Sequence, residues 1–103
     1  SGRPSVRLRW ASLASDDLDH IEEYIAEDDP LMGMDVVLRI IDKVELILPE
    51  HPTAGRIGRV EGTREFVMHG LPFVVVYREF PGEVQILRVL RDSQQWPPMD
   101  SAG

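Results

Sequence analysis

The 103-residue sequence lacks cysteine, which excludes disulfides and thiolate metal sites and leaves the redox compartment unmarked. It also lacks any apolar run near the roughly 20 residues that span a bilayer, and no basic start followed by an apolar stretch indicates a signal peptide. The three histidines, His20, His51 and His69, have no spacing that forms a set of metal ligands. We therefore expect a cytoplasmic protein with no metal, no cofactor and no membrane partner.

Positive charge is scarce in the first half of the chain. Residues 1–49 hold 5 basic and 11 acidic side chains, a balance of −6, whereas residues 50–103 hold 6 and 7, a balance of −1. From Asp16 to Asp29 there are eight carboxylates and no Lys or Arg, and such a surface repels nucleic-acid phosphates. Any nucleic-acid contact must therefore come from the second half, whose basic residues are Arg56, Arg59, Arg64, Arg78, Arg88 and Arg91.

The chain has the length of one domain that buries its core without disulfides or metals. We expect a single domain over residues 6–97. Residues 1–5, which open with Ser1-Gly2 in place of methionine, are expected to be an expression remnant or a disordered N-terminus. Residues 98–103 are expected to form a frayed polar tail.

The first half of the domain carries one strand pattern and two helix patterns. Apolar and basic residues alternate over 6–10, which predicts a short strand. Ser15 is a plausible N-cap for a helix over 15–28, with apolar residues at helical spacing. Asp29-Pro30 is a typical start for a second helix over 30–48, which ends before Pro49. The short connection favours a helical hairpin with one shared apolar seam.

The second half of the domain is predicted to be a loop followed by three strands. Residues 50–62 are rich in proline, glycine and charge, which predicts a loop. Strands are expected over 64–69, 73–80 and 84–91, and the apolar stretch 73–77 indicates a central strand covered on both faces. The order β-α-α-β-β-β predicts an α+β fold with a three- to four-stranded antiparallel sheet, helices on one face and the first strand joining an edge.

Four short segments in the second half carry a family resemblance. They are GTREFV at 62–67, GLPFVVVYR at 70–78, VQILRVLR at 84–91 and QQWP at 94–97. In this order and spacing, over about residues 6–97, the chain resembles the RelE/ParE toxin superfamily, in its ParE-like branch of plasmid-stabilisation proteins. The resemblance implies a toxin of a bacterial toxin–antitoxin pair, whose partner is a cognate antitoxin and which forms a dimer or a hetero-oligomer with it.

Two positions depart from the ribonuclease members of the superfamily, which cut messenger RNA on the ribosome. Those members place an arginine in the central strand, where this chain has Leu71-Pro72-Phe73 and no cation to stabilise phosphate. They also carry a tyrosine near the position of Trp96, and an indole is no phenolic acid or base. Arg91 matches a basic position of the last strand, which is a histidine in many relatives of this branch.

Two interpretations of the charged side chains remain open. For RNA cleavage, Arg64 and Arg91 would hold the phosphate, and Glu65 or His69 would be the base. Alternatively, the arginines solvate the uncovered sheet face, pair with nearby glutamates and contact a target or the antitoxin. That contact set is Arg56, Arg59, Arg64, Arg78, Arg88, Arg91 and Trp96.

Three functions follow from the resemblance. The first is a ParE-like inhibitor of DNA gyrase that acts by binding, which the missing strand arginine, the missing tyrosine and the acidic surface favour. The second is a RelE-like, ribosome-dependent messenger RNA endoribonuclease. The third is a non-toxic member that binds its antitoxin and serves in autoregulation.

Overall fold

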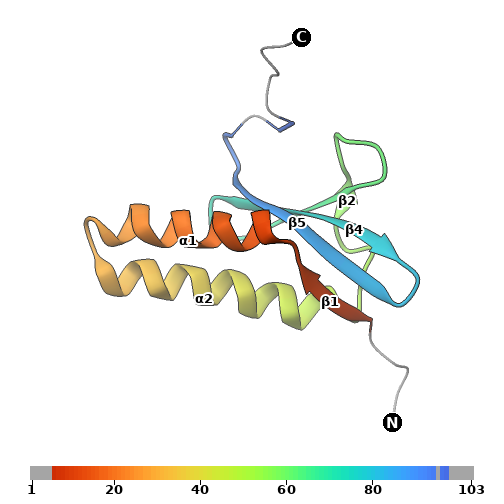
Figure 1. Ribbon diagram of the computed structural model, residues 1–103, viewed down its shortest axis with the longest axis horizontal. Coiled ribbons are helices and arrows are strands. Elements are labelled where there is room, and N and C mark those ends of the chain that lie inside the picture. Colours follow the sequence, from red (N-terminus) through yellow and green to blue (C-terminus); the bar gives the residue numbers. More distant parts are fainter. Residues whose placement is uncertain (1–5, 95, 98–103) are drawn as a thin grey trace.

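The computed structural model describes residues 6–94, 96 and 97, so the expectations for residues 1–5 and 98–103 lie outside the described residues (Figure 1). The elements follow in the order β1 (Arg7–Trp10), α1 (Ser12–Ala26), α2 (Pro30–Ile47), β2 (Arg56–Ile57), β3 (Arg64–Val67), β4 (Phe73–Phe80) and β5 (Glu83–Arg91). Within this part of the chain, no helix is long and apolar enough to cross a membrane.

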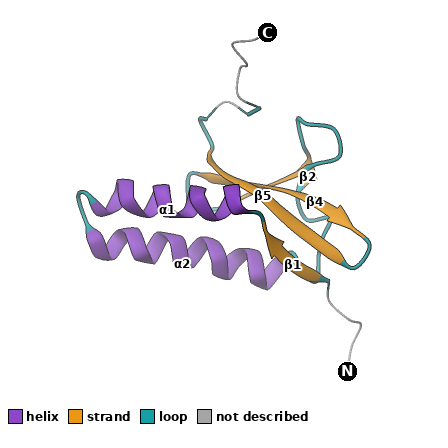
Figure 2. Cartoon of the chain, in the orientation of Figure 1, coloured by secondary structure: helices purple, strands orange, loops and turns teal. Residues whose placement is uncertain are grey.

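The five strands form one sheet in the order β1-β5-β4-β3-β2. Strands β2 to β5 pair antiparallel, as expected, and β1 joins the edge of β5. The pair β1–β5 is parallel, so the sheet is mixed instead of wholly antiparallel. Strands β3, β4 and β5 alternate in direction, so β1, β3 and β5 all run the same way. The predicted α+β class and element order are confirmed, and β4 is the central strand (Figure 2).

The two helices form the predicted hairpin and lie side by side (Figure 1). Asp29 caps α2, since its side chain accepts a hydrogen bond from the backbone N–H of Met32, and Pro30 occupies the first turn. Gly33 lets the helices approach closely. A Cβ atom there would lie 2.8 Å from the carbonyl oxygen of Glu22, so the absence of a side chain at this position sets the helix separation.

The core lies between the hairpin and one face of the sheet. Helix α2 and its C-cap present Ile40, Val44 and Leu48 at a spacing of four residues, and all three are fully buried. They share one apolar cluster with Val75 and Tyr77 of β4. Ile40 and Val75, each within the strongest apolar pattern of its element, are fully buried.

Helix α1 begins earlier than predicted. It starts at Ser12 after Ala11, without a side-chain cap, so Ser15 is not the N-cap. The reason is that Ala14 is fully buried and opens the apolar stripe one turn before Leu18. A single alanine is too weakly apolar to reveal that turn in the sequence.

The segment predicted as a loop over residues 50–62 contains a short strand. Arg56 and Ile57 form β2, which pairs with Glu65 and Arg64 of β3. Strand β3 ends at Val67 instead of residue 69, because the turn to β4 begins at Met68, whose N–H donates to the carbonyl of Phe73. The central strand has the predicted bounds, and β5 begins one residue early.

Truncation of Ile40 to alanine tests the core. We expect Ile40→Ala to lower the free energy of unfolding by about 2–5 kcal/mol, because the side chain is fully buried and leaves a cavity. The matched control is Leu38→Ala on the same helix, where the side chain is 50% exposed. Denaturant titration of both variants measures the difference, and equal losses would contradict this buried face.

Candidate binding surface

Residue alternation along β4 divides the sheet into two faces. Phe73, Val75 and Tyr77 face the helices, whereas Val74 and Val76 face the opposite side, which we call the open face. Among the described elements, no helix covers the open face (Figure 2). The strand register therefore decides which predicted site residues share a face.

Glu65 is the centre of an ion cluster on the open face. It lies opposite Val76, and only 1% of its surface is exposed. Its carboxylate accepts hydrogen bonds from Arg56 Nη2 at 2.9 Å and from the backbone N–H of Arg59 at 3.0 Å. The Arg59 guanidinium lies 3.4 Å away, in ion-pair distance. The predicted contact residues Arg56 and Arg59 thus converge on a carboxylate that had been proposed as a base.

The surroundings of Glu65 decide its charge. Burial would raise the pKa of Glu65, but hydrogen bonds from the Arg59 backbone and the Arg56 side chain, together with the charge of Arg59, outweigh burial and hold the pKa below its ordinary value. The side chain is therefore ionised at neutral pH. It ties the β2 segment to the sheet as a structural anion.

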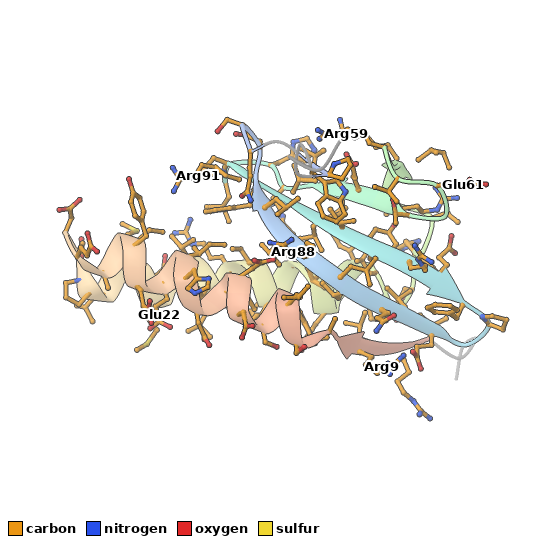
Figure 3. The ribbon with its side chains drawn as sticks, turned by 45° about the horizontal axis from the view of Figure 1, so that its top comes forward. Arg9, Glu22, Arg59, Glu61, Arg88 and Arg91 are labelled. Atoms are coloured by element: carbon orange, nitrogen blue, oxygen red, sulfur yellow. The ribbon has the colours of Figure 1, made fainter. Side chains whose placement is uncertain are left out.

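Arg88 links the sheet to α1. A β-bulge leaves Leu87 without a partner, because Val76 pairs with Arg88 and Tyr77 with Ile86. The guanidinium makes two hydrogen bonds to Asp17 of α1, at 2.7 and 2.9 Å, and they raise the pKa of Arg88 against the opposing effect of desolvation. Figure 3 shows Arg88 on β5 beside α1. Asp17 also accepts from the Val89 backbone N–H at 2.9 Å.

Trp96 adds an aromatic group to this cluster. Its ring centroid lies 5.7 Å from the Arg88 guanidinium carbon, within cation–π range. Its carbonyl oxygen lies 3.4 Å from Arg59 Nη1, which donates to it. The structure thus brings Trp96, Arg59 and Arg88 together, as three members of the predicted contact set.

Arg78 is a further member of the predicted contact set. It follows Val76 by two residues and so lies on the open face. Its guanidinium lies near the turn at Gly62, whose φ of +84° is a conformation that favours glycine. Its Nε is buried and has no hydrogen-bond partner among the described residues.

Arg64 lies on the other face. It pairs in register with Tyr77, and its Nη1 donates to the carbonyl oxygen of Gly55 at 2.9 Å while its Nε donates to Glu79 at 2.8 Å. The Tyr77 hydroxyl donates to the Pro52 carbonyl at 2.7 Å and accepts from the Gly55 N–H at 2.8 Å, and burial raises the pKa of this phenol. Arg64 and Tyr77 therefore hold the loop before β2.

Arg91 is separated from Arg64. Their partners on β4, Phe73 and Tyr77, are four residues apart, which is about 13 Å along a strand. The Arg91 guanidinium carbon lies 5.0 Å from the ring centroid of Tyr24, at a hollow of about 410 Å³ between α1 and β5. Figure 3 shows Arg91 and Arg59 at the same rim of the molecule.

His69, the other candidate base, lies in a different part of the molecule from Glu65. It is exposed in the β3–β4 turn, at a hollow that α2 lines on its other side. Among the described residues, no group of three or more histidine or acidic side chains could hold a metal ion. The carboxylates of the buried Glu65 and of the partly buried Asp17 are both bound by arginines.

Sequence reasoning missed the roles of Asp17 and Tyr24. In the sequence Asp17 is one of the eight carboxylates between Asp16 and Asp29, whereas in the structure it binds a side chain 71 residues away. No local spacing signals a contact over that separation. The exposed face of α1 gave no sign that Tyr24 would lie beneath Arg91.

Acid titration of stability tests the Glu65 cluster. The stabilisation from a carboxylate with a lowered pKa is full above its ordinary value of 4.5 and is lost as the pH falls below that value through the folded-state pKa. At pH 7 we expect Glu65→Gln to lower the free energy of unfolding by about 1.5–3 kcal/mol. The difference from the wild type should shrink steadily towards pH 3. A difference that stays constant with pH would contradict the assignment.

Comparison with known proteins places this architecture in a family. The sequence matches the family model described as ParE toxin of type II toxin-antitoxin system, parDE, over residues 8–96. A protein of Sinorhizobium fredii named as a candidate toxin, Y4kP, is 43% identical over 91 residues. That alignment covers 88% of this chain and 93% of the relative.

Solved structures give the same assignment. A chain of the chromosomal ParDE toxin–antitoxin system from P. aeruginosa is 31% identical, with a TM-score of 0.77 over 84% of this chain and 96% of that one. The RelBE2 toxin–antitoxin complex from Mycobacterium tuberculosis has a chain that is 21% identical, with a TM-score of 0.57, and it shows the fold alone. That match covers 90% of this chain and 98% of the other. These matches confirm the resemblance to the RelE/ParE superfamily: the chain belongs to the ParE toxin family of type II toxin–antitoxin systems.

Proposed function

We propose that this protein inhibits DNA gyrase in the cytoplasm by binding it, and that a cognate antitoxin neutralises it. The observation that carries the proposal is that the charged groups needed for RNA cleavage are bound to other residues. Glu65 is held by two arginines, and its pKa is lowered, so it is a weak base. Arg64 binds a loop carbonyl on the other face of the sheet.

A nuclease site requires those groups in another arrangement. It needs a base and at least one cation within reach of the same scissile phosphate. Arg64 and Arg91 lie at different positions along β4, and Leu71-Pro72-Phe73 carries no cation. Trp96 offers no phenol, so binding is better supported than RNA cleavage.

The proposed gyrase surface lies at the rim where Arg59, Arg88, Arg91 and Trp96 meet solvent. Arginine and tryptophan are enriched among the residues that contribute most to protein interfaces. Arg91 is the most available of these cations, since it is exposed and forms no ion pair with a described carboxylate. Arg59 and Arg88, which form ion pairs, would position Arg91 and orient the indole of Trp96.

The antitoxin proposal rests on family membership and on the relatives described above, two of which come from toxin–antitoxin complexes or systems. We propose that the antitoxin covers this domain with an amphipathic segment. Because the toxin carries a net charge of −7, attraction to an acidic antitoxin can act only locally, and the interface should depend on apolar anchors.

Two parallel assays separate the candidate functions. We expect the purified protein to inhibit supercoiling by gyrase and to leave messenger RNA on programmed ribosomes intact. Arg91→Ala should weaken gyrase inhibition by about 1–3 kcal/mol in affinity. The matched control is Arg9→Ala, because Arg9 is an exposed arginine of the edge strand β1.

Two other outcomes would contradict inhibition of gyrase. Site-specific messenger cleavage that is lost in Arg64→Ala would establish the nuclease and overturn the gyrase proposal. Inactivity in both assays by a protein that still binds its antitoxin would identify a non-toxic family member.

Salt titration tests the apolar character of the antitoxin interface. We expect the affinity of the complex to fall by less than about tenfold between about 0.1 and about 0.5 M NaCl, because screening acts on few ion pairs. Isothermal titration calorimetry at each salt concentration measures this. A loss of several orders of magnitude would mean that arginine pairing dominates.

A further inference from the structure

The hollow between α1 and β5 lies where strand β1 no longer covers the edge of β5. Strand β1 pairs with β5 only as far as Ile86, and α1 packs beside the residues that follow. The hollow has a volume of about 410 Å³. Its polar lining comprises Asp17, His20 and Tyr24 of α1, Arg88 and Arg91 of β5, and Gln94.

The one carboxylate among these lining residues is already engaged. Asp17 Oδ1 accepts a hydrogen bond from Arg88 Nη2 at 2.9 Å. Its Oδ2 accepts from Arg88 Nε at 2.7 Å and from the backbone N–H of Val89 at 2.9 Å. The charges of Asp17 and Arg88 therefore cancel each other, and no acid within the hollow is left for a second cation.

Arg91 is that second cation. Its guanidinium carbon lies 5.0 Å from the ring centroid of Tyr24, and a cation–π contact uses the charge of the group without consuming its five N–H donors. Arg91 is exposed and forms no ion pair with a described carboxylate. Two guanidinium groups and one carboxylate give the hollow a net charge of +1 and more donors than acceptors.

This surplus of donors selects the chemistry of a ligand. A guanidinium binds carboxylate and phosphate groups best, because both accept two parallel hydrogen bonds. The same helix exposes Asp16, Asp19 and Glu23. A nucleic-acid strand brings a charge with every nucleotide and is repelled by such a helix, whereas a side-chain carboxylate brings one charge in all. The hollow therefore favours a single carboxylate.

We propose that the hollow between α1 and β5 binds one carboxylate of the target protein, with Arg91 as its ligand and Tyr24 as the residue that positions Arg91. This site rests on the proposed binding of gyrase and names the chemical group that gyrase presents at the arginine rim. Because the ring of Tyr24 restricts the guanidinium before binding, less side-chain freedom is lost in the complex.

A second copy of this chain also carries carboxylates. A two-fold contact through the hollow would bring α1 close to the α1 of the copy, and each segment from Asp16 to Asp29 holds eight carboxylates and no Lys or Arg. Like charges oppose that approach. Self-association is therefore an outcome that the experiment has to count against the proposal.

The first arm of the experiment tests the hollow without gyrase. Succinate and inorganic phosphate are titrated separately into the isotope-labelled toxin at constant ionic strength, and NMR follows the arginine Nε–H signals. We expect succinate to shift the Arg91 signal saturably with a Kd of about 1–10 mM, and phosphate to bind more weakly. The Arg9 signal is the control, because Arg9 is exposed on β1 and pairs with Glu83.

Two variants of Tyr24 test its positioning role. Tyr24→Phe keeps the ring and Tyr24→Leu removes it, while both replace a side chain that is 60% exposed. We expect Tyr24→Leu to abolish the ring-current shift of the Arg91 Nε–H signal and to weaken succinate binding by about threefold. Tyr24→Phe should preserve both. Thermal unfolding verifies that the two variants fold.

The second arm measures inhibition of gyrase supercoiling with the same two variants. We expect Tyr24→Leu to inhibit about threefold more weakly than the wild type and Tyr24→Phe to inhibit equally well. Equal losses in the two variants would overturn the positioning role, because the phenylalanine keeps the contact with Arg91.

Each contrary result has a distinct meaning. Phosphate binding that is tighter than succinate binding, or equal and unsaturable shifts of Arg91 and Arg9, overturns the carboxylate site and leaves the inhibition of gyrase intact. Shifts of the Arg91 signal that grow with toxin concentration alone assign the hollow to a second copy and also overturn it. Succinate binding by a wild-type protein that does not inhibit gyrase refutes the proposed function and gyrase as the source of the carboxylate.

Discussion

The burial of β4 on both faces is the constraint on which the rest of the structure depends. Residues 73–77 are all buried, so the molecule must supply a cover on each side. The helical hairpin covers one side with Ile40, Val44 and Leu48. On the other side no described helix is present, and the arginines bound to Glu65, the turn that holds Arg59, and Trp96 lie over this face.

The burial of the open face explains the position of the arginines. Because Glu65 is held in a nearly inaccessible place on β3, its charge has to be compensated, and Arg56 and Arg59 do so from the segment around β2. The charge of Asp17 is compensated in the same way by Arg88. The described basic residues of the second half are therefore largely engaged in the architecture, whereas Arg91 among them is exposed and forms no ion pair with a described carboxylate.

The sequence predicts the parts of this fold that rest on local patterns. The bounds of β4 follow from five consecutive apolar residues, and the start of α2 follows from Asp29-Pro30. It does not predict the start of α1 at Ser12 or the two-residue strand β2, because Ala14 and Arg56-Ile57 carry almost no periodic signal. The site is less predictable still, since the bond between Asp17 and Arg88 joins residues 71 apart, and only tertiary packing brings them together.

The hydrogen bond from the Val89 backbone N–H to Asp17 also closes part of a sheet edge. Strand β1 pairs with β5 only as far as Ile86, which leaves the following backbone at a sheet edge in a strongly β-forming sequence. Such an edge is a template for association with other chains and, in the extreme, for fibril growth. By occupying this N–H with a carboxylate from α1, the fold removes one of the donors that an added strand would need at this edge.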